Sequence, residues 1–153
     1  MAKKPQLFIF LFNLLPLLLL LLGEAKATLY QDCGSEDKII SFEMVDCDKP
    51  PCIVRRPTTQ YINITFEAES DAEYLTTTIE AKIGGIPFPW PGPGGCDLLL
   101  SGECPLRTGN EYFYSAKMPV LEEYPSVLAY VTWRLLDEEE RVRFCGVLII
   151  DIV

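Results

Sequence analysis

The 153-residue sequence contains no histidine. Without an imidazole there is no Ser-His-Asp triad, no Cys-His pair and no histidine ligand for a metal, so most hydrolytic and zinc chemistry is excluded. Carboxylates remain, and on residue types alone a glycosidase-like pair stays open. The densest acidic run, residues 137–140, joins two apolar segments and is interpreted as a solvated turn. We therefore predict a protein that is not an enzyme and that needs no cofactor or metal.

Positive charge is scarce, because 13 Lys and Arg residues stand against 22 Asp and Glu residues and give a formal net charge of -9. Setting aside residues 1–27 removes three lysines and one glutamate, which lowers the net charge to -11. Such an acidic surface repels the phosphates of nucleic acids and of anionic lipids. The charge balance therefore argues against nucleic acid, and against an anionic membrane as the primary partner.

The N-terminal segment has the composition of a secretory signal peptide. Two lysines precede an apolar run over residues 7–22, and Ala25 and Ala27 supply small residues at positions -3 and -1 of a cleavage site. The run is shorter than the roughly 20 apolar residues needed to span a bilayer, and a retained anchor is the alternative. We predict a signal peptide over residues 1–27 and a single mature domain over residues 28–153.

All six cysteines lie in the predicted mature domain. An even number of cysteines behind a signal peptide indicates disulfides formed in an oxidising compartment, and six cysteines permit 15 pairings. The spacing of the cysteines narrows these 15 pairings. Two pairs of cysteines bracket short loops, and closing both loops leaves the first cysteine to pair with the last. The predicted pairs are Cys47–Cys52, Cys96–Cys104 and Cys33–Cys145. A zinc site is the competing interpretation, but it lacks both CxxC spacing and histidine.

Apolar residues alternate with polar ones nearly everywhere in the mature domain, which is typical of β-strands. The clearest segments are residues 61–68, 75–83, 127–135 and 142–152, and shorter ones are residues 39–46 and 111–118. No segment has a convincing helical period, so we predict an all-β antiparallel sandwich. In the first segment Ile62 and Ile64 share one face and Asn63 lies on the other. Asn63 begins the only Asn-x-Ser/Thr sequence, which predicts glycosylation on the outer surface.

Two proline-punctuated segments carry large apolar side chains. Alternating prolines in residues 86–96 fix φ and remove backbone donors, so we predict a stiff extended edge or loop that presents Ile86, Phe88 and Trp90. This segment is interpreted either as a lid that plugs the core or as the rim of an apolar ligand cavity. Residues 118–126 are also apolar and are predicted to be a loop. Two such loops at one end of a sandwich would form a hydrophobic mouth, although the alternation does not show that they meet.

At these residues the sequence resembles the ML lipid-recognition family. Within that family it is most similar to the small secreted sterol carriers of the Niemann-Pick type C-two kind, also called epididymal secretory proteins. The resemblance covers residues 29–153 and rests on the order of the cysteines, the Asn63 sequon within a strand and both proline segments. Their motifs are Gly-Ile-Pro-Phe-Pro at residues 85–89 and Tyr-Pro-Ser at residues 124–126.

The resemblance implies an immunoglobulin-like β-sandwich that holds a lipid between its sheets, with the same three disulfides. Positions that line the ligand in this family correspond here to Ile86, Phe88, Tyr114, Val120, Tyr124, Pro125 and Trp133. Gly146 stands where the family commonly has a tryptophan, so we expect an enlarged or reshaped cavity. Gly94 and Asp97, on either side of Cys96, also depart from the family and bear on which membrane protein accepts the lipid.

We therefore predict a secreted, soluble and monomeric protein that binds and transfers a sterol or similar lipid, with hand-off to a membrane-protein acceptor left open. The alternatives are a carrier of fatty acids or chemical signals, a lipid-sensing immune recognition protein, and an adhesion-type sandwich with a solid core. The predicted location is extracellular, and the endosome–lysosome lumen is left open as a second compartment.

Overall fold

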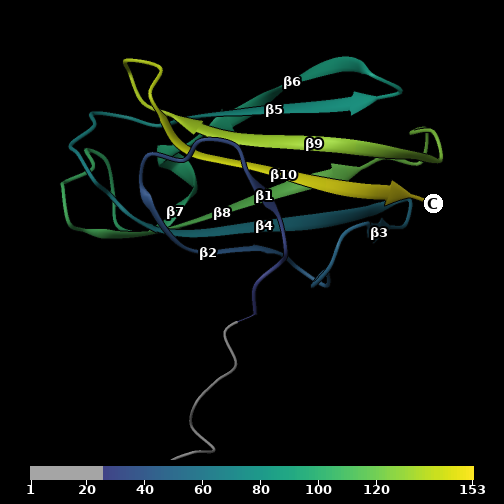
Figure 1. The fold of residues 1–153 in the computed structure, drawn as a ribbon, viewed down its shortest axis with the longest axis horizontal. Helices are drawn as coiled ribbons and strands as arrows, with labels where there is room; N and C mark the ends of the chain where they lie inside the picture. The colour runs from purple at the N-terminus through teal and green to yellow at the C-terminus, as the bar shows by residue number, and fades with distance from the viewer. Residues whose placement is uncertain (1–25) are drawn as a thin grey trace, which may run out of the picture.

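The computed structural model describes residues 26–153, so nearly all of the predicted signal peptide lies outside the described residues. The strands are β1 (Gln31–Asp32), β2 (Lys38–Met44), β3 (Cys52–Val54), β4 (Thr58–Glu67), β5 (Thr76–Ile83), β6 (Ile86–Gly94), β7 (Leu99–Ser101), β8 (Glu111–Val120), β9 (Val127–Leu136) and β10 (Val142–Ile152) (Figure 1). A 3-10 turn, η1 (Cys96–Leu98), is the one helical segment in this part of the chain. Over the same residues, no helix has the length and apolar character needed to cross a membrane.

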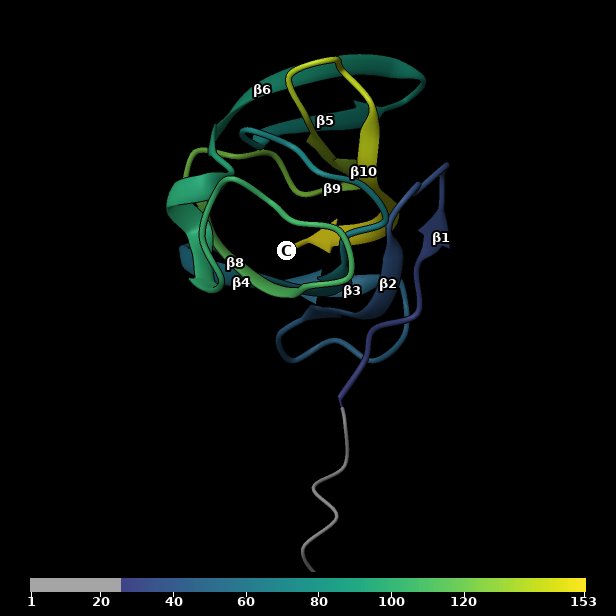
Figure 2. The same ribbon diagram turned by 90° about the vertical axis from the view of Figure 1, so that its left-hand side faces the viewer.

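The strands form two sheets that face each other (Figure 2). The larger sheet has the order β1-β10-β9-β5-β6, with β3 pairing in parallel with the end of β10, and the smaller sheet has the order β2-β4-β8-β7. All other strand pairs are antiparallel. The predicted antiparallel β-sandwich is thus confirmed.

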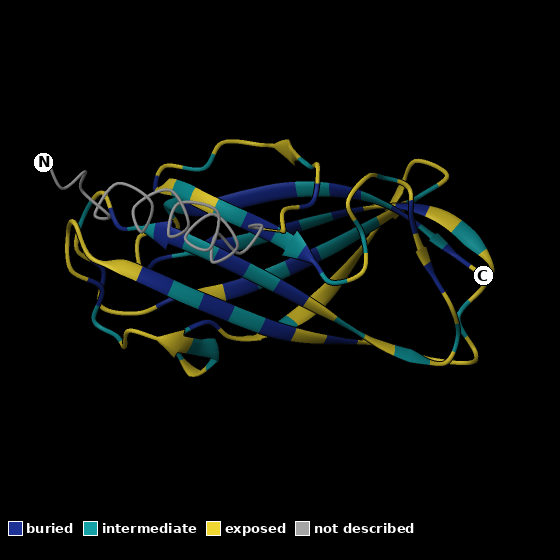
Figure 3. Ribbon diagram, turned by 90° about the horizontal axis from the view of Figure 1, so that it is seen from below, coloured by how far each residue is buried: buried dark blue, intermediate teal, exposed yellow. Residues whose placement is uncertain are grey.

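The alternation in the sequence sets which side chains enter the space between the sheets, as the banded burial along the strands shows (Figure 3). On β4, Ile62, Ile64 and Phe66 are buried, whereas Asn63 is partly exposed on the outer face. There the Asn63 amide nitrogen donates to Glu43 at 3.1 Å and its oxygen accepts from the Ser115 hydroxyl at 2.8 Å. The predicted glycosylation position therefore lies on the outside of the smaller sheet.

Aromatic side chains fill the half of the interior that lies toward the β9–β10 hairpin. Ring centroids are 5.3 Å apart for Phe42 and Phe144, and 5.6 Å apart for Phe66 and Tyr112. Tyr30 joins the first pair at 4.7 Å from Phe42. Aromatic rings bury large areas, so this half of the sandwich has a solid core.

The three predicted disulfides are present, with Cα–Cα distances of 5.0 Å for Cys33–Cys145, 5.5 Å for Cys47–Cys52 and 5.8 Å for Cys96–Cys104. The first joins residues 112 positions apart and ties the N-terminal segment to β10. In the chain-entropy model a loop of that size contributes roughly 4–5 kcal/mol by constraining the unfolded chain.

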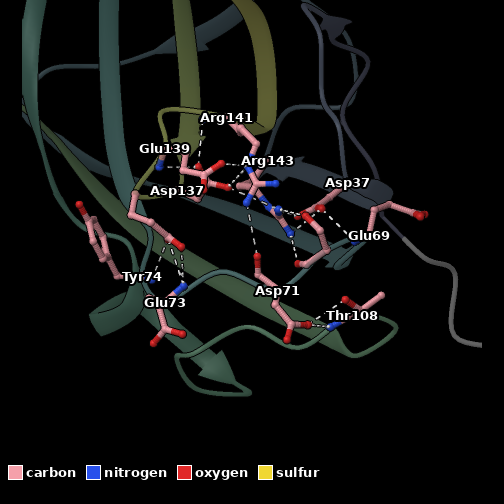
Figure 4. A network of polar contacts seen from close by, with 12 residues as sticks. Asp37, Glu69, Asp71, Glu73, Tyr74, Thr108, Asp137, Glu139, Arg141 and Arg143 are labelled. Carbon is pink, nitrogen blue, oxygen red and sulfur yellow. Dashed lines mark hydrogen bonds and ion pairs between the residues drawn. The ribbon is translucent and has the colours of Figure 1, made fainter.

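A buried ion cluster closes the end of the sandwich at the β9–β10 hairpin (Figure 4). The Arg143 guanidinium lies 2.9 Å from Asp37 and 3.6 Å from Asp137, and it donates to the Ser70 hydroxyl and carbonyl, each at 2.6 Å. Burial raises the pKa of the Asp37 carboxyl, although the backbone N–H of Glu69 and the charge of Arg143 oppose that rise. The cluster joins the β9–β10 hairpin to the segment before β2 and to the loop between β4 and β5.

The prediction of a solvated turn over residues 137–140 is wrong at its first residue. Residues 138–140 are exposed, but the Asp137 side chain is fully buried. Its carboxylate accepts from the backbone N–H groups of Glu139 and Arg141, each at 3.0 Å, and from the Arg141 side chain at 2.8 Å. Charged hydrogen bonds of this kind offset the cost of removing a carboxylate from water.

Candidate functional site

An apolar cavity of about 430 Å³ lies between the sheets at the end opposite the ion cluster, where β8 and β10 end and β9 begins. Its volume falls within the range of about 300–1,000 Å³ that is usual for ligand pockets. Most of its walls come from alternate positions of strands, and the rest come from the β8–β9 loop. The lining residues are Ile79, Ala81, Ile83, Phe88, Trp90, Met118, Pro119, Val120, Tyr124, Pro125, Val127, Ala129, Val131, Ile150 and Ile152.

The cavity lies where the inward side chains of β5, β9 and β10 are aliphatic and two of them, Ala81 and Ala129, are alanines. Along β9 the inward positions change from Trp133 to Val131 and Ala129, and β5 presents Ala81 at the same level as Val131. Two sheets of a sandwich lie about 10 Å apart, and short aliphatic side chains leave part of that space unfilled. The interior is thus divided into an aromatic half with a solid core and an aliphatic half with a cavity.

The two proline-punctuated segments meet at the mouth of this cavity. Trp90 of β6 and Tyr124 of the β8–β9 loop make an edge contact, with ring centroids 5.5 Å apart and an interplanar angle of 72°. Residues 86–94 form the edge strand β6, and residues 118–120 are the end of β8, so only residues 121–126 of the second segment form a loop. Burial raises the pKa of the Tyr124 hydroxyl, and the charge of Glu123 adds to the shift.

The β8–β9 loop is held in place by hydrogen bonds from outside the cavity. The Arg56 guanidinium donates to the carbonyl of Tyr124 and, at 3.3 Å, to the carbonyl of Val153. The Ser126 hydroxyl donates to the carbonyl of Ile152 at 2.9 Å. These contacts attach the loop to the end of β10 and so position Tyr124 against Trp90.

The edge of β6 beside the mouth has no backbone donors along its proline run. Pro87, Pro89 and Pro91 pair in register with Lys82, Glu80 and Thr78 of β5. A proline has no N–H to donate to β5, so these positions are the non-hydrogen-bonded ones, whose backbone faces away from β5. Only carbonyls therefore point outward there, and this edge resists pairing with another strand.

A second, more polar hollow of about 330 Å³ adjoins the cavity along this edge. It shares Ile79, Trp90, Met118 and Pro119 with the cavity and extends to Lys117 of β8. Strand β7 pairs with β8 only as far as Tyr114, so the later part of β8 has a free edge that faces β6. The sandwich is consequently open along one side, next to the cavity.

The structure brings four of the residues predicted from the family resemblance into the cavity wall, namely Phe88, Val120, Tyr124 and Pro125. Ile86 is 62% exposed and lies outside the lining, while Tyr114 and Trp133 are buried beyond the inner end of the cavity. The alternation predicts which face of a strand these side chains occupy. How far the cavity extends along each strand depends instead on the side chains that face each other across the sandwich.

Gly146 does not line the cavity. A Cβ atom at this position would lie 2.6 Å from the ring of Phe144 and 3.1 Å from the ring of Tyr30, so the ring of Phe144 occupies the space beside the glycine. The enlargement expected from the missing tryptophan is therefore filled by an aromatic ring from the same strand.

Trp90 was predicted only as part of a possible cavity rim, and the aliphatic lining residues of β5, β9 and β10 were not singled out from the sequence as ligand-lining residues. Their alternation placed them on inward faces, and the small residues Ala81 and Ala129 within those faces were the available signal. A small residue on an inward face has two explanations, a close approach of the sheets or a cavity, and only the packed structure distinguishes them.

Comparisons with known proteins agree with this geometry. The model of the ML domain matches residues 27–152 of the chain. The chain is 32% identical over 136 residues to the NPC intracellular cholesterol transporter 2 of Mus musculus, covering 87% of this chain and 90% of that protein. It is 36% identical over 121 residues to the NPC intracellular cholesterol transporter 2 homolog a of Drosophila melanogaster, covering 75% and 80%. The crystal structure of a Niemann-Pick type C2 protein from the Japanese carpenter ant has a similar fold, with a TM-score of 0.74 at 22% identity, covering 82% of this chain and 99% of that one.

Proposed function

Because the chain belongs to the ML-domain family, we propose that it is a secreted carrier that holds a sterol or similar lipid in the cavity between its two sheets. The family resemblance inferred from the cysteines and the proline segments is confirmed. The chain is an ML-domain lipid-binding protein related to the NPC2 sterol carriers, and these are binding proteins without enzymatic activity.

The observation that carries the proposal is the chemistry of the cavity wall. Among the lining side chains, only the Tyr124 hydroxyl and the Trp90 indole N–H are strong hydrogen-bonding groups, and both belong to the mouth. A polar group placed deeper would lose its hydrogen bonds to water without replacement. The wall thus favours a ligand with a long apolar body and a single polar end that stays at the mouth.

Affinity for such a ligand comes mainly from the apolar area that it removes from water, at roughly 25 cal/mol per Å². Lost translational and rotational freedom reduces that sum considerably. The Cys47–Cys52 disulfide stands beside one wall of the cavity, because Cys52 pairs in register with Ile150 of β10. A preformed cavity limits the reorganisation that binding requires, which favours reversible loading and transfer.

Secretion, glycosylation and hand-off form a second part of the proposal. Cleavage after Ala27 would release a monomeric chain beginning at Thr28, and three disulfides suit an oxidising compartment. Asn63 lies on the outer face of β4, away from the cavity, where a glycan would leave the mouth open. Delivery of the lipid to a membrane-protein acceptor would use the side on which the mouth opens.

The proposal is tested by expressing the full chain in eukaryotic cells and analysing the secreted protein by native mass spectrometry with lipid extraction. We expect a mass that starts at Thr28, a glycan at Asn63 and a co-purified sterol that a fluorescent sterol displaces. A co-purified fatty acid or other lipid would instead favour the alternative carrier function. Protein that is empty and binds no apolar probe would refute the lipid-carrier function.

A further inference from the structure

A polar contact between the two sheets lies behind the inner end of the cavity. The hydroxyls of Thr77 on β5 and Tyr114 on β8 share a hydrogen bond of 2.9 Å. Strand β5 belongs to the larger sheet and β8 to the smaller one, so this bond crosses the sandwich. Both side chains are buried.

The register places this contact next to the last lining residue of β5 and one inward position beyond the next residue of β8. Thr77 is the next inward position of β5 after Ile79, and Trp133 of β9 pairs with Ile79 in the sheet. On β8 the inward positions run from Met118 through Ala116 to Tyr114. Residues on one face of a strand repeat about every 7 Å, so the hydrogen bond lies within one or two side chains of the cavity.

The surroundings of this contact hold it in place. A Cβ atom on Gly92 of β6 would lie 2.1 Å from the carbonyl oxygen of Thr77, so the glycine allows β6 to pack closely against Thr77. The indole N–H of Trp133 is buried and makes no hydrogen bond of ordinary geometry, but it lies near enough to the Tyr114 hydroxyl to act on the pKa of that group. Separating the two hydroxyls would deprive both of their buried partner.

We propose that the contact between Thr77 and Tyr114 limits ligand length, because it fixes the inner wall of the cavity and so sets the longest apolar body that the cavity accepts. This inference rests on the proposed lipid-carrier function. A ligand with its polar end at the mouth points its apolar end toward the contact, with Ile79 and Met118 between them. Any further length must break a buried hydrogen bond and displace the Tyr114 ring, or leave apolar surface in water at the mouth.

The test measures binding of saturated primary alcohols of increasing chain length by their displacement of a fluorescent sterol. For the wild type we expect affinity to rise with each added carbon, by up to about fourfold per buried methylene, and then to stop rising at a definite length. Tyr114→Ala removes the ring. We expect the chain length at which affinity stops rising to become at least two carbons longer in this variant, and alcohols beyond the wild-type length to bind at least tenfold more tightly.

Tyr112→Ala is the matched control, because Tyr112 is a buried tyrosine on the same face of β8 that contacts Phe66 instead of the cavity end. In Tyr112→Ala, the chain length at which affinity stops rising should equal that of the wild type. If Tyr114→Ala does not fold, Tyr114→Phe keeps the ring and loses the hydrogen bond, and we expect a several-fold gain for alcohols just beyond the limit.

The outcomes separate this inference from the proposed function. A folded Tyr114 variant with an unchanged length limit, or the same shift in Tyr112→Ala, would overturn the role of the contact while leaving lipid binding intact. A wild-type protein that binds neither the fluorescent sterol nor any alcohol would overturn the lipid-carrier function itself.

Discussion

Replacing Phe88 by alanine tests whether this residue forms part of the cavity mouth, and Ile86 on the same strand serves as the comparison. Phe88 lines the cavity and is 50% exposed, whereas Ile86 is 62% exposed and lies outside the lining. The family resemblance assigns both residues to the ligand site, and of the two only Phe88 lies in the cavity wall. The two substitutions to alanine therefore have different expected effects on lipid binding.

The size of the effect follows from the exposed half of the Phe88 ring. A phenylalanine buries about 150–250 Å² when fully covered, so a ligand covers at most about 75–125 Å² of this side chain. At roughly 25 cal/mol per Å², that contact contributes up to about 2–3 kcal/mol. Imperfect contact reduces the gain, so we expect Phe88→Ala to weaken binding by about 1–2 kcal/mol, or about 5- to 30-fold in Kd.

The assay is a fluorescent-sterol titration accompanied by urea denaturation of each variant. Phe88→Ala should lose less stability than the about 3–5 kcal/mol typical of a fully buried phenylalanine, because half of the ring is already in water. Ile86→Ala should change Kd by less than about twofold, since surface substitutions usually have small effects. Wild-type affinity in Phe88→Ala, or an equal loss in Ile86→Ala, would refute the assigned mouth.

Three further predictions concern a residue of the cavity wall, the buried ion cluster and the loss of stability at low pH. Ala129→Phe projects a ring into the cavity and should abolish sterol fluorescence binding, whereas Leu128→Phe on the exposed face of β9 should preserve it; binding by Ala129→Phe would contradict the cavity assignment. Arg143→Met leaves the buried Asp37 carboxylate without a counter-charge and Asp137 with Arg141 alone, so it should lower the free energy of unfolding by about 3–5 kcal/mol in urea, and a loss below about 1 kcal/mol would refute the role of the cluster. Hydrogen bonds from the backbone and side chain of Thr108 lower the pKa of Asp71 from 3.8 to about 2, so its stabilisation is present above the unfolded value and is lost as the pH falls toward 2. The stability difference between wild type and Asp71→Asn should be constant from about pH 7 to pH 5 and shrink below about pH 4, and a difference independent of pH down to 2 would contradict the lowered pKa.

The two-residue alternation predicted the long strands correctly because it reflects a local property of the chain. Residues 61–68, 127–135 and 142–152 differ from the observed strands by only a few residues at their ends. The short strands β1, β3 and β7 were not predicted, since two or three residues are too few to establish a pattern. Strand β6 was predicted only as an extended edge or loop, because its prolines remove every second donor while the remaining positions still pair with β5.

The burial of charged side chains could not be predicted from the neighbouring residues in the sequence. Asp137 lies in an acidic run that resembles a solvated turn, and its burial depends on Arg143 in the same hairpin and on the neighbouring loops. Asp37 is 106 residues from Arg143 in the chain, so nothing near either residue indicates that they pair. Electrostatic partners that are distant in sequence become apparent only when the fold brings them together.

Local chemistry in the chain was sufficient to predict the sandwich, the three disulfides and the outward position of Asn63, and it identified the two apolar segments without showing that they meet. Alternation, cysteine spacing and proline geometry act over a few residues, so they can be recognised without knowing the fold. The extent of the cavity was decided by tertiary packing. Phe144 fills the space beside Gly146, and the hydrogen bond between the Thr77 and Tyr114 hydroxyls joins the two sheets behind the cavity. An empty volume between two sheets depends on which side chains face each other across it, and that pairing joins strands that are far apart in the sequence.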